Sequence, residues 1–119
     1  MKTTAKEFGV FKAECERLIP TLGLNGWTFY FKHTFAKDTY ARTHTDTITK
    51  VCSIIFSTEW DDNGGAHPAT KQAVERVAKH EMAHALLADL YSLARSRYVQ
   101  TDELDEAEHR VVRVLEKLL

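Results

Sequence analysis

Residues 80–84 read His-Glu-Met-Ala-His, which is an HExxH pattern. The spacing of this pattern can bring its two histidines together only in a helix, so it strongly constrains the structure of this segment. In a helix, residues four apart lie one turn apart on the same face, so His80 and His84 would present two imidazoles together. Two imidazoles so placed can bind one Zn²⁺ ion, and Glu81 can then accept a proton from a water on that metal. The pattern therefore predicts a metal, a general base and a hydrolytic reaction together.

The sequence around the pattern has a broad apolar side when it is drawn as a helix. At about 100° per residue, the apolar residues between Ala73 and Ala88 form one arc, and His80, Glu81 and His84 fall inside it. The opposite side carries the polar residues Lys71, Gln72, Glu75, Arg76 and Lys79. Polar groups on the packed side of a helix cost free energy unless a partner satisfies them. This placement favours a bound metal over the alternative, in which the pattern is accidental and Glu81 pairs with a lysine.

A third metal ligand is expected from another element, because catalytic zinc takes three protein ligands and keeps one position open. The last part of the chain predicts a helix with an apolar stripe formed by Leu104, Val111, Val112, Leu115 and Leu118. Glu108 projects about 30° from the centre of that stripe, so we expect it to be the third ligand. The alternatives are a carboxylate that reaches water or pairs with Arg110, and ligation by Asp105 or His109 instead.

Length and composition indicate one soluble globular domain. The chain has 119 residues, enough for a single modest core, and its 44% hydrophobic and 28% charged residues are not those of a disordered protein. The formal net charge of −1 gives no strong field for nucleic acid or a membrane. No early apolar run resembles a signal peptide, and no charge-free stretch has the length of a membrane span. Cys15 and Cys52 are isolated, which favours a reducing, cytoplasmic setting over a disulfide framework or a zinc ribbon.

The order of predicted elements is α-β-β-β-α-α. A capping box from Thr4 to Glu7 predicts a helix over about residues 4–19, and Pro20 and the glycines that follow predict its end. Strands are predicted over residues 27–31, about 40–45 and about 47–57. A turn at residues 61–65 precedes a helix from Pro68 to about Ser92, and Thr101 is the expected N-cap of a last helix that runs nearly to Leu119. We therefore expect one α+β domain over residues 1–119, with a small antiparallel three-stranded sheet.

The remaining candidates for a role in the site have weaker signals. Three histidines show no ligand spacing and are assigned to no metal: His33, His44 and His67. Tyr91 shares the face of the two motif histidines and Tyr98 precedes the last helix, so either could donate a hydrogen bond to an oxyanion. The strand that ends near Ser57 could form a sheet edge beside the cleft and pair with an extended peptide.

These features resemble those of the gluzincin-type zinc metallopeptidases, in which HExxH is followed some two dozen residues later by a helical glutamate. The layout is similar to that of the short zincin-like proteins encoded by phages and prophages, close to the peptidase domain of the ImmA/IrrE group. The segments that carry the resemblance are residues 24–27, 80–87 and 105–112. The resemblance implies that His80, His84 and Glu108 bind zinc and that Glu81 is the catalytic base. The sequence departs from that group where His109 and Arg110 follow the glutamate, and it lacks the cysteine ribbon of SprT-like proteins.

The expected function is that of a zinc-dependent metallopeptidase with one Zn²⁺ per chain and a peptide or protein substrate. If a phage encodes the chain, the host cytoplasm is the expected location. One alternative is a phage accessory or binding protein that zinc stabilises without useful turnover, since a structural metal helps a small core. Another is a zinc amidase that acts on a non-peptide substrate such as a cell-wall fragment.

Overall fold

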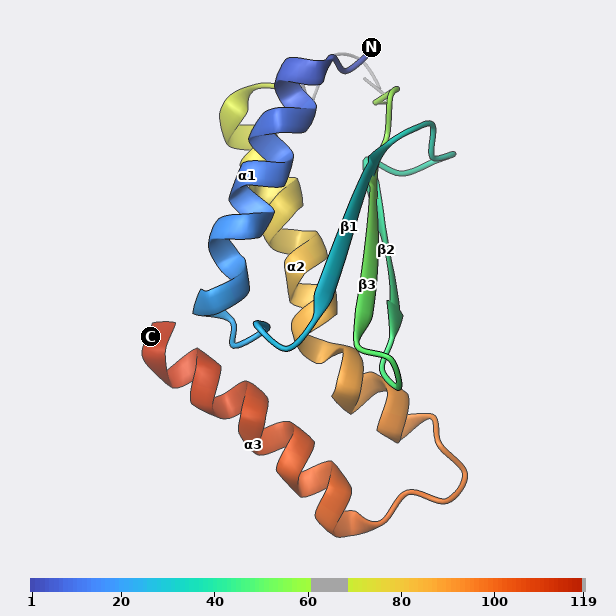
Figure 1. The fold of residues 1–119 in the computed structure, drawn as a ribbon, viewed down its shortest axis with the longest axis vertical. Coiled ribbons are helices and arrows are strands. Elements are labelled where there is room, and N and C mark those ends of the chain that lie inside the picture. The colour runs from blue at the N-terminus through green and yellow to red at the C-terminus, as the bar shows by residue number, and fades with distance from the viewer. Residues whose placement is uncertain (61–68, 119) are drawn as a thin grey trace.

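The computed structural model describes residues 1–60 and 69–118, and these residues form an α+β domain of three helices and one three-stranded sheet (Figure 1). The elements are α1 (Ala5–Thr21), β1 (Thr28–His33), β2 (Ala41–Asp46), β3 (Val51–Phe56), α2 (Lys71–Ala94) and α3 (Thr101–Leu118). The predicted turn at residues 61–65, Pro68 and His67 lie outside the described residues. Within the described residues, no helix is long and apolar enough to cross a membrane.

The capping box predicted at the start of the chain is confirmed. The Thr4 hydroxyl accepts a hydrogen bond from the Lys6 amide, and the Glu7 carboxylate accepts one from the Thr4 amide at 2.9 Å. These bonds satisfy amides that the first turn of a helix leaves without partners. The helix includes Pro20 in its last turn, and the chain then reverses at Gly23, which has a φ of +70°. Glycine adopts this left-handed conformation without steric cost.

The sheet is mixed, so the prediction of a wholly antiparallel sheet is wrong at one strand. The strand order is β1-β3-β2, in which β2 runs antiparallel to β3 but β1 runs parallel to it. The short connection over residues 34–40 suggested a hairpin between β1 and β2. Instead β2 leaves one strand position empty beside β1, and β3 occupies that position between β1 and β2. The last strand also begins later than predicted, because Asp46 accepts hydrogen bonds from Ile48 and Thr49 and makes residues 47–50 a turn.

The predicted edge position of the strand near Ser57 is also wrong, because β3 lies in the middle of the sheet. Its alternate residues Cys52, Ile54 and Phe56 are buried, whereas Ile48, inside the predicted strand, is 92% exposed in the turn before β3. The two edges of the sheet are β1 and β2. An edge strand therefore does lie beside α2, but it is β2.

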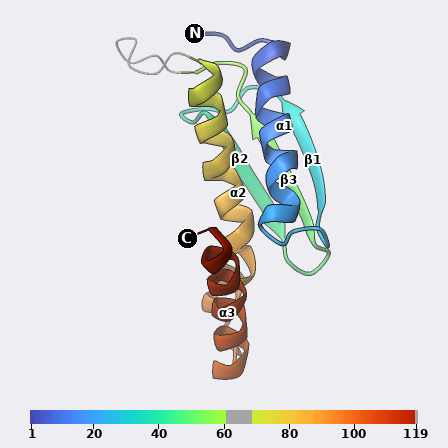
Figure 2. The ribbon, with the colours of Figure 1, turned by 90° about the vertical axis from the view of Figure 1, so that its left-hand side faces the viewer.

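Helices α1 and α2 pack side by side on one face of the sheet, α1 next to β1 and α2 next to β2 (Figures 1 and 2). The core between these layers contains Phe11, Cys15, Cys52, Ile54, Phe56, Trp60, Val74, Ala78 and Met82. Because β2 and α2 meet at the border of this core, their inward side chains lie partly in it and partly at its rim. The HExxH residues are on this border.

Helix α3 packs against α2 and extends away from the sheet (Figures 1 and 2). Its buried residues are Ala107 and Val114, neither of which belongs to the predicted apolar stripe. Three members of that stripe are exposed: Val112, Leu115 and Leu118. The helix begins one residue earlier than predicted, since Gln100 accepts the first amide hydrogen bonds, from Glu103 and Leu104. Thr101 is thus the first helical residue and not the N-cap.

Candidate functional site

Residues 80–84 lie in the middle of α2, as the pattern requires. The N-terminus of this helix is capped by Thr70, whose hydroxyl accepts a hydrogen bond from the Ala73 amide at 3.2 Å. The Nε2 atoms of His80 and His84 are 3.3 Å apart, and the two rings meet edge to face. Ligand atoms of His80, Glu81 and His84 all lie within 4.8 Å of one another. The helix therefore brings the three predicted residues to one point.

The burial of these three residues differs from the prediction. Glu81 is 6% exposed, as the apolar arc implied, but His80 and His84 are exposed. The buried residues of α2 are Val74, Ala78, Glu81, Met82, Ala85 and Ala88. At about 100° per residue, both histidines lie roughly a quarter of a turn or more from the centre of that set. Their rings consequently open onto solvent at the flank of the helix, where an ion or a substrate could reach them.

The carboxylate of Glu81 is held by the neighbouring strand. The Thr43 hydroxyl on β2 donates a hydrogen bond of 2.7 Å to Glu81 Oε1. A buried carboxylate needs such a donor, because an unpaired charge loses hydration without compensation. Thr43 was not among the residues singled out in the sequence. The sequence shows alternating threonines at positions 43, 45 and 47. Only the packing of β2 beside α2 shows which of these threonines contacts Glu81.

A cleft of about 660 Å³ lies between β2 and α2, and it is bordered by His80, Glu81 and His84. Tyr91, one of the two tyrosines proposed as oxyanion donors, also borders this cleft. Its hydroxyl accepts a hydrogen bond from Arg95 Nη1 at 3.1 Å. Tyr98 borders none of it and is 85% exposed in the connection before α3. Tyr91 is therefore the tyrosine that the fold brings to the cleft.

Glu108 is not brought to the histidines. It is exposed on α3, so its predicted place on the core face of that helix is wrong. Within the described residues, the group of possible metal ligands consists of His80, Glu81 and His84 and includes no residue of α3. The alternatives Asp105 and His109 are also exposed, and His109 Nδ1 lies 2.7 Å from the Asp105 carbonyl oxygen. The role of Glu108 as third ligand stays a prediction that this arrangement does not favour.

The other described histidines lie away from the group. His33, at the end of β1, stacks on Phe8, and its Nε2 atom lies 2.8 Å from the Thr3 hydroxyl. The same hydroxyl donates to the Ser57 carbonyl oxygen at 2.7 Å, so it accepts from the His33 N–H. His44 is exposed on β2. Neither residue belongs to the ligand group.

The two cysteines are free and buried in the core beneath Glu81. Burial, with a smaller contribution from the negative charge of Glu81, raises the pKa of the Cys52 thiol to about 12. Burial likewise raises the pKa of the Cys15 thiol far above its usual value, with Glu81 again adding to the effect. Both side chains are fully buried, and neither belongs to the group of possible metal ligands among the described residues.

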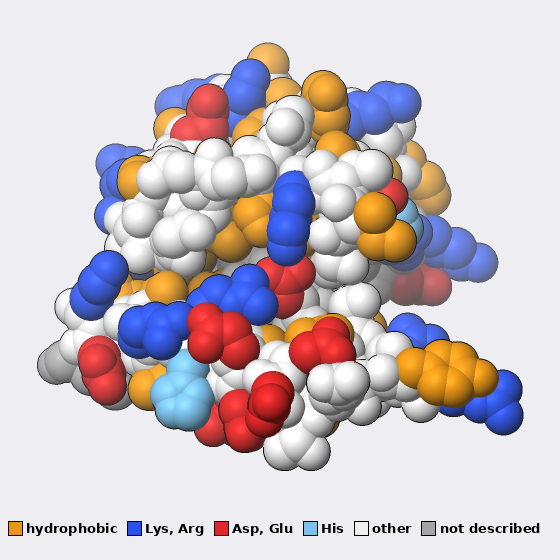
Figure 3. All heavy atoms as spheres, turned by 60° about the horizontal axis from the view of Figure 1, so that its bottom comes forward, with side chains coloured by type: hydrophobic (Ala, Val, Ile, Leu, Met, Phe, Trp, Pro, Cys, Tyr) orange, Lys and Arg blue, Asp and Glu red, His pale blue; other side chains and the backbone are white. Residues whose placement is uncertain are grey.

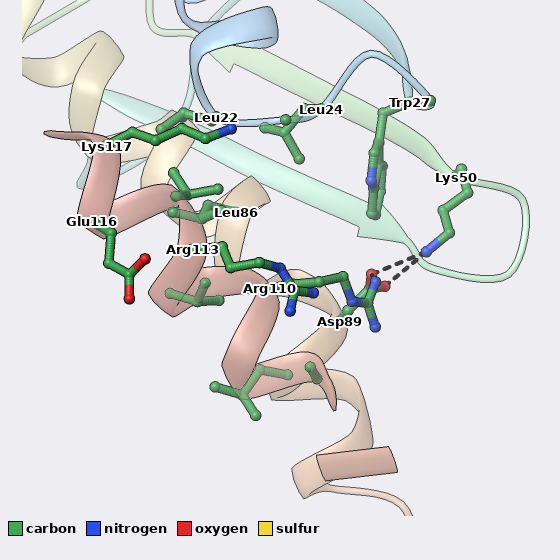
Figure 4. Close-up of a pocket in the computed structure, with 16 residues that line it drawn as sticks. Leu22, Leu24, Trp27, Lys50, Leu86, Asp89, Arg110, Arg113, Glu116 and Lys117 are labelled. Atoms are coloured by element: carbon green, nitrogen blue, oxygen red, sulfur yellow. Dashed lines mark hydrogen bonds and ion pairs between the residues drawn. The ribbon is translucent and has the colours of Figure 1, made fainter. Parts of the chain in front are cut away.

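A separate hollow of about 600 Å³ lies between α2, α3 and the turn that follows α1 (Figures 3 and 4). Asp89 stands at its edge and accepts hydrogen bonds from Lys50 Nζ at 2.9 and 3.1 Å and from Arg110 at 2.8 Å. Lys50 also lies 5.2 Å from the centre of the Trp27 ring. Charged side chains of both signs surround this apolar hollow, and none of the HExxH residues lines it. It is therefore distinct from the cleft at β2.

Comparison of the chain with known protein families, with curated proteins and with solved structures finds no match.

Proposed function

We propose that the chain is a zinc-dependent metallopeptidase whose active site is the cleft between β2 and α2. The observation that carries the proposal is the convergence of His80, Glu81 and His84, whose ligand atoms lie within 4.8 Å of one another at the border of that cleft. A glutamate beside two histidines one helical turn apart supplies both metal ligands and a base. The resemblance to short zincin-like proteins points to the same chemistry.

The donor set fits zinc. In a tetrahedral site, two Zn–N bonds of about 2.0–2.1 Å hold their nitrogens about 3.3 Å apart. The two Nε2 atoms are 3.3 Å apart, so one ion can lie between them without movement of the helix. Both rings are exposed and border the cleft, so water and substrate can reach them. His80 and His84 would therefore supply two of the three protein ligands that catalytic zinc takes. When bound, it would polarise the scissile carbonyl and make a nearby water more acidic.

The carboxylate of Glu81 would transfer the protons. It would accept one from the attacking water as the water oxygen bonds to the carbonyl carbon, and would give it to the amine as the C–N bond breaks. The Thr43 hydroxyl holds Oε1 at 2.7 Å and so fixes the carboxylate while leaving Oε2 free for this transfer. Thr43 thus acts as a positioning residue. The edge of β2 supplies unpaired backbone N–H and C=O groups with which an extended peptide could pair beside the histidines.

The proposal is tested by peptide hydrolysis with zinc-loaded protein and with its Glu81→Gln variant. We expect the variant to keep the metal and to lose about 10²- to 10⁴-fold in kcat, because a general base contributes that much. Glu75→Gln, on the same helix but outside the cleft, should be fully active. A fully active Glu81→Gln protein would contradict the proposal. A protein that binds zinc, unfolds on chelation and cleaves no peptide would instead be a zinc-stabilised binding module.

A further inference from the structure

Two further hollows adjoin the cleft at β2 and extend it along α2. One, of about 280 Å³, shares His80 and Glu81 with the cleft and is bordered by Trp60 and Arg76. The other, of about 680 Å³, shares Thr43 and Tyr91 with the cleft and is bordered by Arg95. Together they form one elongated surface depression, the extended cleft, with the HExxH residues inside it.

The extended cleft is basic although the whole chain carries a formal charge of −1. Three arginines border it: Arg42, Arg76 and Arg95. Glu81 is the one carboxylate among the described residues that line it, and this group is already engaged with Thr43. Six of the chain's acidic residues lie on α3 and line none of the three hollows: Asp102, Glu103, Asp105, Glu106, Glu108 and Glu116. The separation of charge leaves the cleft attractive to anions.

None of the three arginines forms an ion pair with a carboxylate in the described part of the chain. Arg42 donates to the Lys37 carbonyl oxygen at 3.3 Å, and Arg95 donates to the Tyr91 hydroxyl while stacking on its ring. These are neutral partners. By contrast, Arg17, Arg110 and Arg113 each pair with a carboxylate. Within the described part of the chain, the charges of the three arginines at the cleft therefore remain available to a bound anion.

We propose that the extended cleft selects acidic peptides, with carboxylates on both sides of the bond that is cleaved. This inference rests on the proposed peptidase function, since it names the substrate of the same site. Arg76 on α2 and Arg95, the C-cap residue of that helix, are 19 residues apart, or about 28 Å at 1.5 Å per residue. An extended peptide of about nine residues covers that distance at about 3.3 Å per residue. The two histidines lie nearer Arg76, so the shorter part of the peptide would bind on that side.

A peptide fits this surface better than a nucleic acid does. Edge strand β2 presents the backbone groups that pair with an extended peptide. Single-stranded nucleic acid needs aromatic rings on which successive bases stack. Tyr91 already has Arg95 over its ring, and Trp60 is 1% exposed. Among the described Phe, Tyr and Trp residues of the extended cleft, Tyr91 is the one exposed ring, and a single ring does not stack successive bases.

The binding test uses zinc-loaded Glu81→Gln protein, which should hold a peptide without cleaving it. Three fluorescent nine-residue peptides differ only in their polar side chains, which are Asp and Glu, Asn and Gln, or Lys. We expect the acidic peptide to bind at least about tenfold tighter than the neutral one at low salt, and the lysine peptide to bind weakest. The preference should shrink as salt rises, because the Debye length falls from about 10 Å at 0.1 M to about 3 Å at 1 M.

Variants in the same background locate the charge. Arg76→Gln and Arg95→Gln should each weaken binding of the acidic peptide by about twofold to fivefold, the usual effect of an exposed ion pair, and leave the neutral peptide unaffected. Arg97→Gln is the matched control, because Arg97 is exposed and borders none of the three hollows. It should bind both peptides as the parent does.

Equal binding of the acidic and neutral peptides would overturn the inference. So would a single-stranded oligonucleotide that binds more tightly than the acidic peptide and loses affinity in the same arginine variants. The wild-type protein separates this inference from the proposed function. Cleavage of acidic and neutral peptides with equal kcat/KM would refute the inference alone. A protein without zinc or cleavage that still prefers the acidic peptide would refute the proposed function, while the preference of the extended cleft for acidic peptides would stand.

Discussion

Helix α2 beside β2 and helix α3 show opposite relations between an amphipathic pattern and its burial. Helix α2 is enclosed by α1 on one side and β2 on another, and six of its residues are buried. Helix α3 packs mainly along α2, and Ala107 and Val114 are its buried residues. Where neighbours enclose a helix on two sides, much of its apolar arc is buried. Where a helix packs mainly against one neighbour, an apolar stripe can remain in solvent, as Leu115 and Leu118 do.

The two helices also carry different parts of the predicted metal site, and only the part on α2 comes together in the structure. His80, Glu81 and His84 belong to one helix, so their spacing alone brings them together. Glu108 had to be brought to them by the packing of a second helix, and α3 is rotated so that this residue is exposed. Local spacing is therefore a stronger basis for a site than the expected meeting of two elements.

The largest difference in stability between the two helices should come from truncation of their apolar residues. Met82 on α2 is fully buried, and Met82→Ala should lower the free energy of unfolding by about 2–5 kcal/mol, the usual cost of such a cavity. Leu115→Ala on α3 should change it by less than about 0.5 kcal/mol, because Leu115 is 43% exposed. Urea denaturation at fixed metal content measures both. Equal losses would show that α3 is packed as tightly as α2.

Loss of the hydrogen bond from β2 should reduce catalysis. In Thr43→Val the Glu81 carboxylate loses its donor, a bond to a charged group worth about 1.5–3 kcal/mol. We expect kcat to fall by about tenfold to a hundredfold with KM and zinc content unchanged, and Thr43→Ser to restore most of the activity. Thr28→Val, at an exposed threonine of β1 outside the cleft, is the control. An unchanged kcat in Thr43→Val would remove Thr43 from the site.

The attachment of α3 should depend in part on Asp89, which lies on α2. Asp89 forms ion pairs with Arg110 on α3 and with Lys50 at the end of the sheet (Figure 4). Both cations are more than a third exposed, so solvent weakens the pairs, and Asp89→Asn should cost no more than about 1 kcal/mol. Amide hydrogen exchange should quicken in α3 more than in α2. Glu116→Gln, on α3 without an ion pair among the described residues, should leave the exchange unchanged.

The smallest effect is expected at Glu108. Because this residue is exposed and outside the ligand group, Glu108→Ala should keep its full zinc content and activity. Metal analysis of the purified variant gives the result. Loss of zinc in Glu108→Ala would mean that α3 turns toward the histidines when the metal binds, as the resemblance to gluzincins implies.

Much of the fold follows from local signals. The capping box at Thr4, the strand-forming segments and the helix through the HExxH pattern each depend on neighbouring residues, and the structure has them close to the predicted positions. The parallel pairing of β1 with β3 could not be predicted in this way. It depends on which strand fills the position beside β1, and short connections fit more than one arrangement.

The candidate site shows the same contrast between features that depend on neighbouring residues and features that depend on packing between elements. The grouping of His80, Glu81 and His84 follows from helical spacing, whereas the partner of Glu81 depends on the register of β2 against α2. The exposure of the two histidines depends on the rotation of α2, which the mixed composition of its apolar arc left undetermined. Leu87 lies in that arc and is 42% exposed, so membership of the arc did not ensure burial.

The most direct test of the central claim is the zinc content of the purified protein and of two histidine variants, measured by elemental analysis after removal of loosely bound metal. We predict about one zinc per chain for the parent, and loss of that zinc in His80→Ala and in His84→Ala with the fold retained by circular dichroism. His44→Ala, at an exposed histidine outside the ligand group, should keep the metal. A parent protein without zinc, or histidine variants that keep it, would contradict the account.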